Sequence, residues 1–359
     1  MRRYRWWFGG LALTAVVVLV AVFALLGRQS PGPQDDLPGP PGTGPLTVVA
    51  MGDSTLSGEG AGNYLPETNG LNGNWCHRSP NASVHKIDLP GPEETINLAC
   101  SGAPSAQVAL GDIRQWTEPS QAQRLAELTK THRVSAVVVA LGANDDPHFS
   151  GLISECFRAW FSDRVPPCSD RIKADWQRRV DAMVPKVVGA VEDIRKVLRR
   201  AGYDTEDYQL VLQSYAAPIG PDIPEEYRSL NGCPFRIEDL RWVKQEAVKT
   251  LAAGLREAAA QTSARFLDFS SAGYGHEACS GGDDPSSEWF SRLTVQWTDL
   301  TDADRAGHAI QDSFHPNAAG HAQFARCVTE FLGTADPAAA CLEGDDGRLH
   351  AATVAGPLN

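Results

Sequence analysis

The stretch Leu46-Thr-Val-Val-Ala-Met-Gly-Asp-Ser-Thr-Leu-Ser-Gly-Glu-Gly60 decides how the rest of the chain is interpreted. It begins with an apolar, β-branched run, Leu46 to Met51, which has the length and composition of a buried strand. Gly52 then permits a tight turn, and Ser54 follows where the chain leaves the sheet. Open α/β sheets bind ligands at the carboxyl ends of their strands. The Ser54 hydroxyl is therefore expected at a ligand-binding edge, although serines at strand ends are common and this one alone predicts no catalytic role.

The rest of the chain alternates strand and helix patterns. Val134 to Leu141 is apolar on both faces, as in a strand buried inside a parallel sheet, and it ends in Gly142-Ala-Asn-Asp145. Shorter strand patterns occur at 96–103, 209–215 and 265–268. Helices are expected at 118–132, 171–201, 237–262 and 317–332, with Pro185 kinking or splitting the second of them. This order predicts an α/β fold: a doubly wound, mainly parallel five-stranded sheet with helices on both faces.

Composition limits the possible partners. The chain has 359 residues, of which 42% are hydrophobic and 21% charged, enough for one large core. Its formal net charge is −12, and the arginine-rich N-terminus makes the remainder more acidic still. An acidic protein is a poor counterpart for nucleic acid or anionic lipid headgroups. We therefore expect no nucleic-acid partner.

The N-terminus has the pattern of an export signal. Arg2, Arg3 and Arg5 precede an apolar run, residues 6–26, that is long enough to cross a bilayer as a helix. This run is either a signal peptide or an uncleaved anchor, and its length and the lack of a clear cleavage site favour the anchor. The positive-inside rule then places everything after it outside the cytoplasm. The expected location is the cell surface, through a membrane contact at residues 6–26, or the medium if the helix is cleaved.

Four segments follow from these patterns. Residues 1–27 form the signal-anchor or signal peptide, and the Pro/Gly-rich residues 28–45 form a linker. The globular domain is expected at 46–335. Residues 336–359 are expected to form a partly disordered C-terminal tail.

The cysteines agree with export. An even number in an exported chain indicates disulfides, although eight cysteines allow 105 connectivities. No Cys-x-x-Cys pair occurs, so no spacing resembles a zinc site. We expect neighbours along the chain to pair, each bond contributing about 2 to 4 kcal/mol. The expected pairs are Cys76 with Cys100, Cys156 with Cys168, Cys233 with Cys279, and Cys327 with Cys341.

A second reactive stretch lies near the C-terminus, Gln311-Asp-Ser-Phe-His-Pro-Asn-Ala-Ala-Gly-His321. Pro316 suits the start of the last helix, so Asp312 and His315 lie on the loop leading into it. A carboxylate at Asp312 could accept the Nδ1 proton of His315 and leave Nε2 free as a general base. Taken alone, Asp-x-x-His is more often structural than catalytic.

Four blocks together are far more specific than any one of them: Gly52-Asp-Ser-Thr-Leu56, Asn97-Leu-Ala-Cys-Ser-Gly102, Gly142-Ala-Asn-Asp145 and Asp312-Ser-Phe-His315. In order and separation they resemble the SGNH hydrolases, also called GDSL lipases/esterases. The segment Asn74-Trp-Cys-His-Arg-Ser79 and the cysteines look like the actinobacterial secreted lipase and esterase branch. The resemblance covers roughly residues 46–332.

This resemblance implies roles for individual residues. Ser54 would be the nucleophile, His315 its base and Asp312 the group that orients His315. The oxyanion hole would comprise the backbone N–H groups of Ser54 and Gly102 and the side-chain amide of Asn144. The chemistry is coherent, because a serine hydroxyl needs an imidazole to remove its proton and the tetrahedral intermediate needs preorganised donors.

Some of these polar residues also have simpler or different interpretations. Asp53 is more simply a turn carboxylate than a catalytic group. Asp145, Asp146 and His148 could be metal ligands, but the cluster lacks further partners nearby, and no metal or other cofactor is expected. The chain has no Gly-x-Ser-x-Gly elbow, no phosphate-binding Gly-x-x-x-x-Gly-Lys loop and no His-Glu-x-x-His helix.

The sequence therefore predicts an exported, monomeric serine ester hydrolase that acts on acyl esters through an acyl-enzyme. A lipid or small acyl ester is the first choice of substrate, and an O-acetylated cell-wall or plant carbohydrate is the second. A protein of a different class, which keeps the fold and binds a surface without turnover, is the remaining alternative.

Overall fold

The computed structural model describes residues 40–353 except 93, 301–304 and 306–307. The expected membrane segment at 6–26 and most of the expected linker lie outside the described residues. Within the described part, none of the helices combines the length and the apolar character that a bilayer crossing requires.

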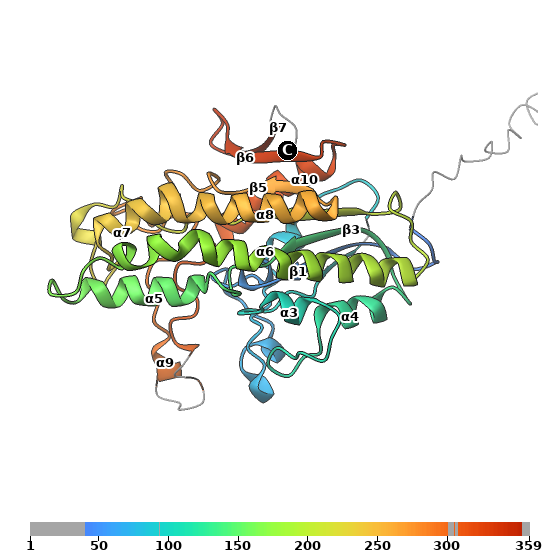
Figure 1. The fold of residues 1–359 in the computed structure, drawn as a ribbon, viewed down its shortest axis with the longest axis horizontal. Coiled ribbons are helices and arrows are strands. Elements are labelled where there is room, and N and C mark those ends of the chain that lie inside the picture. Colours follow the sequence, from blue (N-terminus) through green and yellow to red (C-terminus); the bar gives the residue numbers. More distant parts are fainter. Residues whose placement is uncertain (1–39, 93, 301–304, 306–307, 354–359) are drawn as a thin grey trace, which may run out of the picture. The chain divides into compact units, whose positions relative to one another are not determined.

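A seven-stranded sheet forms the centre of the fold, with strand order β2-β1-β3-β4-β5-β6-β7 (Figure 1). Neighbouring strands are parallel from β2 through β6, and β7 pairs antiparallel to β6. The strands are β1 (Leu46–Gly52), β2 (Glu94–Asn97), β3 (Arg133–Ala140), β4 (Gln209–Gln213), β5 (Arg265–Asp268), β6 (Ala338–Glu343) and β7 (Leu349–Thr353). The doubly wound, mainly parallel sheet predicted from the sequence is confirmed.

The order of the first strands creates a crevice. The chain passes from β1 to β2 on one side of β1, and it then returns to β3 on the other side. In open α/β sheets, ligands bind outside the carboxyl ends of the strands where the winding direction reverses. Ser54 follows β1 and Asn144 follows β3, so both lie at this reversal.

The helices cover the sheet on both faces. In Figure 1, α8, α6 and α5 lie in front of the strands, and α6 packs against both α4 and α8. On the other face, α10 packs against β7 and against the short 3₁₀ helix η3 (Ser83–Lys86). The α-helices are α2 (Ser54–Ser57), α3 (Ser105–Val108), α4 (Gln121–Leu128), α5 (Phe149–Trp160), α6 (Cys168–Arg200), α7 (Ile237–Trp242), α8 (Val248–Thr262), α9 (Trp297–Leu300) and α10 (Ala318–Leu332).

Apolar periodicity explains the longest strand and the longest helix of the described residues. Val137, Val138 and Val139 of β3 are fully buried, as expected of a strand covered on both faces. Helix α6 is amphipathic and turns one apolar stripe toward the core. Pro185 lies inside α6 on its exposed side, and the helix runs through it without being split. A single backbone hydrogen bond lost at a proline is therefore outweighed here by burial of the stripe.

The sheet has two more strands than the sequence predicted. Both lie in the segment 336–359 that was expected to be a partly disordered tail. Strand β6 is mainly alanine and carries no β-branched residue, so strand propensity does not identify it. Its pairing with β5 and the disulfide from Cys341 to Cys327 in α10 hold it in the sheet.

Four disulfides join neighbouring cysteines, with the pairings expected from the sequence: Cys76–Cys100, Cys156–Cys168, Cys233–Cys279 and Cys327–Cys341. All eight cysteines are used. The first bond ties the loop that follows β2 to the segment around Cys76, beside the crevice.

Gly52 is the tightest point between β1 and β3. Its φ is +137°, and a Cβ added to it would lie 1.8 Å from the carbonyl oxygen of Ala140. The side chain of Gln121 bonds both backbone groups of Gly52, at 2.7 Å each. Only glycine therefore fits where the chain turns toward Ser54.

Replacing Gly52 with alanine should destabilise the protein by about 3 kcal/mol or more, because the new methyl group meets backbone that cannot move without breaking the β1–β3 pairing. Urea unfolding followed by circular dichroism measures the change. The matched control is Gly189→Ala in α6, where nothing lies within 4 Å of the added Cβ. It should change stability by no more than about 1 kcal/mol, in the stabilising direction. Equal effects of the two substitutions would contradict the steric argument.

Candidate active site

Ser54 is presented by a sharp turn between β1 and α2. The Asp53 carboxylate caps α2 by accepting a hydrogen bond from the Thr55 backbone N–H at 3.0 Å. The Asp53 N–H donates to the Ala140 carbonyl at 3.0 Å, which ties the turn to β3. Gly58 then ends the helix in the left-handed region. These contacts leave the Ser54 side chain partly exposed at the carboxyl edge of the sheet.

His315 reaches Ser54 from the far end of the chain. Its Nε2 atom lies 2.9 Å from the Ser54 Oγ. Two backbone bonds to Ser291 fix the loop on either side of the ring: Ser291 N–H donates to the His315 carbonyl, and Phe314 N–H donates to the Ser291 carbonyl, both at 2.9 Å. Phe314, the residue before His315, has a φ of +60°, a strained conformation that is often found at functional sites. Ser54 and His315, both expected from the sequence, are brought into hydrogen-bond contact.

The expected bond between Asp312 and His315 is not formed among the described residues. The Nδ1 atom of His315 instead lies 3.2 Å from the backbone carbonyl oxygen of Ser313. The Asp312 carboxylate is held elsewhere, because it accepts from the Tyr64 hydroxyl at 2.5 Å and from the Gln296 amide at 2.8 Å. Sequence spacing placed Asp312 near the ring, but it could not show that two other donors compete for its carboxylate.

The three groups expected to form an oxyanion hole lie on three neighbouring loops. Neither the Ser54 nor the Gly102 backbone N–H makes a hydrogen bond to another described residue. The Asn144 amide has only long contacts, 3.5 Å to the Asp53 carboxylate and 3.4 Å to the Ala103 carbonyl. Gly102 has a φ of +77°, which favours glycine at this position. These donors are thus free or weakly engaged.

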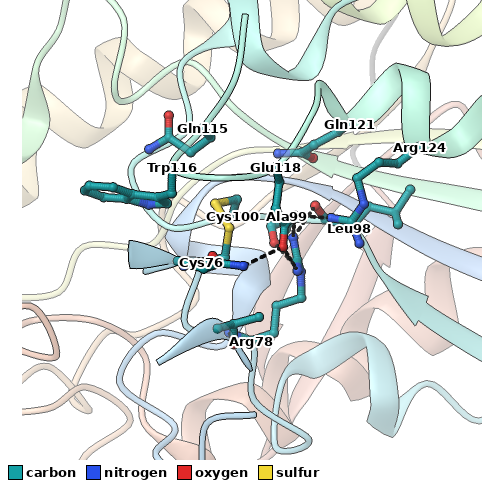
Figure 2. A network of polar contacts seen from close by, with 12 residues as sticks. Cys76, Arg78, Leu98, Ala99, Cys100, Gln115, Trp116, Glu118, Gln121 and Arg124 are labelled. Atoms are coloured by element: carbon teal, nitrogen blue, oxygen red, sulfur yellow. Dashed lines mark hydrogen bonds and ion pairs between the residues drawn. A yellow bond between two sulfur atoms is a disulfide. The ribbon is translucent and has the colours of Figure 1, made fainter. Parts of the chain in front are cut away.

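A buried ion network supports the loop that carries Gly102 (Figure 2). Arg78 donates to the carbonyl oxygens of Ala99 at 2.8 Å and Leu98 at 3.2 Å. Two further N–H groups of Arg78 donate to the two oxygens of the Glu118 carboxylate at 2.6 and 2.5 Å, and Arg124 donates to the same carboxylate. Burial opposes ionisation of Glu118, but Arg78 and Arg124 outweigh it and lower its pKa. Such charge-assisted, two-point contacts are among the most rigid in proteins.

The same loop is fixed from two other directions. The Cys76–Cys100 disulfide crosses it (Figure 2). The side chains of Gln115 and Trp116 donate to the Ser101 carbonyl at 3.1 and 3.3 Å. Sequence reasoning did not find Arg78, Glu118 or Trp116. The signal that could have identified Arg78 was the Asn74–Ser79 segment, which was noted only as a mark of the branch.

Asp53 is buried at the base of the site. Its carboxylate accepts from the Tyr215 hydroxyl at 2.5 Å, and Tyr215 also accepts from the Ala143 backbone N–H at 3.4 Å. Burial raises the pKa of Asp53 to about 6, against the lowering effect of the bonds from Tyr215 and Thr55. Asp53 thus links the loops of Ser54 and Asn144, in agreement with the structural role expected for it.

An apolar cavity of about 110 Å³ opens beside the Ser54 and His315 side chains. Its wall is mainly aliphatic and aromatic, and Asp53, Asn144 and Tyr215 contribute its polar part. The apolar residues that line it include Phe149, Ile153, Pro218, Leu251, Phe290, Phe314 and Phe324. A small apolar cavity with a few convergent polar groups is typical of a site for a small organic group.

Two of the three residues considered as possible metal ligands, Asp145, Asp146 and His148, have protein partners: Asp145 bonds Ser105, and Asp146 pairs with Lys186 at 2.6 Å. A different trio, Glu59, His77 and Asp312, has ligand-type atoms within 4.8 Å of one another. These atoms already bond one another and Tyr64, so they have partners without an ion.

This chain is similar to several known proteins. A protein of Streptomyces coelicolor named Lipase 2 is 26% identical over 294 residues, covering 80% of this chain and 86% of that protein. Two solved structures are similar: an extracellular lipase from Streptomyces rimosus and a phospholipase A1 from Streptomyces albidoflavus NA297. Their TM-scores are 0.49 and 0.47 and their identities 20% and 23%, and each match covers 77% of this chain and 94% of the other.

The model of one protein family matches residues 50–323. That range contains Ser54, Gly102, Asn144 and His315, and it spans most of the chain. The chain belongs to the GDSL-like lipase/acylhydrolase family.

Proposed function

We propose that this protein hydrolyses carboxylic acyl esters, with Ser54 as the nucleophile and His315 as the general base. One observation carries the proposal: the Ser54 Oγ lies 2.9 Å from the His315 Nε2 although the two residues are 261 positions apart. The pair opens onto an apolar cavity and stands beside free N–H donors. Nucleophile, base, donors and a place for the substrate are the parts that acyl transfer needs.

The reaction follows the ordinary course of serine catalysis. His315 removes the proton of the Ser54 hydroxyl while Oγ bonds to the ester carbonyl carbon, which gives a tetrahedral oxyanion. The C–O bond to the alcohol then breaks, the alcohol takes the proton from Nε2, and an acyl group remains on Ser54. Water, activated by the same imidazole, releases the acid and restores Ser54. The Ser54 and Gly102 N–H groups and the Asn144 amide would stabilise the oxyanion, each by about 3 kcal/mol.

The Ser313 carbonyl is the group that would orient His315. By accepting the Nδ1 proton it selects the tautomer whose Nε2 lone pair faces Ser54. This role is assigned to Ser313 in place of Asp312, whose carboxylate is bonded to Tyr64 and Gln296. A carbonyl is uncharged, so it orients the ring without contributing a negative charge.

The cavity points to a short acyl group. An apolar cavity of roughly 150 Å³ holds a benzene molecule, so about 110 Å³ accommodates a chain of about four carbons. The same site takes an acetyl group, and an O-acetylated carbohydrate is therefore the second candidate substrate. With four disulfides and no free cysteine in the chain, we propose that the enzyme acts outside the cytoplasm.

A fluorophosphonate probe should label the folded protein at Ser54 alone, because in the described part of the chain this is the hydroxyl paired with a base beside oxyanion donors. Mass spectrometry of the digested adduct locates the label. Ser54→Ala should prevent labelling and lower kcat by about 10⁴-fold or more. Ser57→Ala, at the last residue of the same short helix α2, is the control and should keep both the labelling and the wild-type kcat. Labelling of another residue in folded wild-type protein would refute the assignment.

Hydrolysis of p-nitrophenyl acetate, butyrate, hexanoate, octanoate and laurate should give the highest kcat/KM at butyrate or hexanoate, because longer chains exceed the cavity. Ile153→Ala, which removes part of the cavity wall, should shift the optimum to a longer chain. Arg158→Ala on the exposed side of the same helix should not.

Acetylated xylan belongs in the same series. Turnover of xylan above that of every p-nitrophenyl ester would favour the carbohydrate substrate. A rise in kcat/KM through laurate would contradict the size limit.

A further inference from the structure

Glu59 is a buried acid that the proposed reaction does not use. It follows α2, five residues after Ser54, and its side chain is 0% exposed. It accepts hydrogen bonds from His77 Nδ1 at 2.7 Å and from the Gln311 amide at 2.8 Å. Among the described residues no lysine or arginine pairs with it, so its charge has no cationic partner of the usual kind. Burying a carboxylate without a lysine or arginine partner costs free energy.

His77 helps to hold this carboxylate in place. Its Nδ1 lies 2.7 Å from the Glu59 carboxylate, and its Nε2 is buried without a hydrogen-bond partner in the described part of the chain.

The chain at Glu59 also lies close to the loop that carries His315. The next residue, Gly60, packs so closely on the loop that a Cβ added there would lie 2.9 Å from the His315 Cβ. The Gln311 amide that bonds Glu59 also bonds the Ser101 hydroxyl at 2.9 Å, next to Gly102. One buried carboxylate is thus linked to the base loop and to the loop carrying an oxyanion donor.

We propose that Glu59 is a positioning residue for catalysis: its buried carboxylate supplies the negative charge that stabilises protonated His315, and through Gln311 it aligns the His315 and Gly102 loops. It would thereby take the electrostatic role that Asp312 was expected to fill. The inference rests on the proposed function of Ser54 and His315.

Burial also shifts the pKa values of other titratable groups around Glu59. Burial raises the pKa of the Tyr64 hydroxyl, so it stays protonated. Burial and the neighbouring Glu59 raise the pKa of Asp312, whereas the His77 bond and the His315 ring, against the effect of burial, lower the pKa of Glu59 to about 2. Burial lowers the pKa of His321 to about 4, so that ring is neutral.

The test compares Glu59→Gln with Asp312→Asn through the pH dependence of kcat/KM on p-nitrophenyl butyrate. A nearby negative charge raises the pKa of a histidine, so removing it should move the acidic limb to lower pH. For Glu59→Gln we expect a downward shift of about half a pH unit or more, a fall in kcat of about tenfold or more and a change in KM of less than about threefold. Asp312→Asn should move the limb by less than half as much.

The matched control is Glu277→Gln, which neutralises another buried carboxylate, paired with Lys244 at 2.6 Å. It should lower stability without moving the acidic limb. A folded Glu59→Gln variant with the wild-type limb and kcat would overturn the inference while leaving the Ser54 assignment intact. If Glu59→Gln does not fold, Asp312→Asn decides: an unmoved limb supports Glu59, and a shift of half a unit or more assigns the charge to Asp312. Absence of fluorophosphonate labelling in wild-type protein would instead refute the proposed function itself.

Discussion

The parallel pairing of β1 with β3 is the constraint on which the site depends. This pairing brings the ends of two strands together at the point where the winding of the sheet reverses, with Gly52 opposite Ala140. Ser54 and Asn144 then emerge side by side from turns that could not otherwise meet. The contact between Gly52 and Ala140 is so close that no side chain fits between them. The loops of Gly102 and His315 complete the candidate site, and each is held by its own contacts.

Much of the fold could be predicted because its signals are local. The apolar runs of β1 and β3 and the amphipathic stripe of α6 follow the periods of buried strands and helices, and the structure confirms them. Strand β6 could not be found in this way, since a run of alanines has no strand pattern and its place is set by β5 and by a disulfide. The Asp346-Gly347 pair in the turn before β7 was the available hairpin signal, with Gly347 at a φ of +71°.

The sequence suggests candidate site residues, but it could not predict their contacts. Short motifs point to Ser54 and His315. A motif gives the residue types, and therefore the functional groups that are present. Which donor an acid meets depends on groups far away in the sequence, as Asp312 shows: its partners Tyr64 and Gln296 lie on separate loops. For the same reason the Arg78–Glu118 pair, 40 residues apart, was not visible before the fold was known. Buried polar networks of this kind are specified by tertiary structure.

The central claim is that the Ser54 hydroxyl, the His315 ring and the free donors converge on one substrate carbonyl group, with the hydroxyl facing its carbon and the donors its oxygen. A crystal structure of the protein after reaction with a phosphonate ester tests it most directly, because the adduct mimics the tetrahedral intermediate. The account predicts phosphorus bonded to the Ser54 Oγ, with one phosphonate oxygen about 2.7 to 3.1 Å from both the Gly102 N–H nitrogen and the Asn144 amide nitrogen. An adduct on another residue, or an oxygen turned away from these donors, would contradict it.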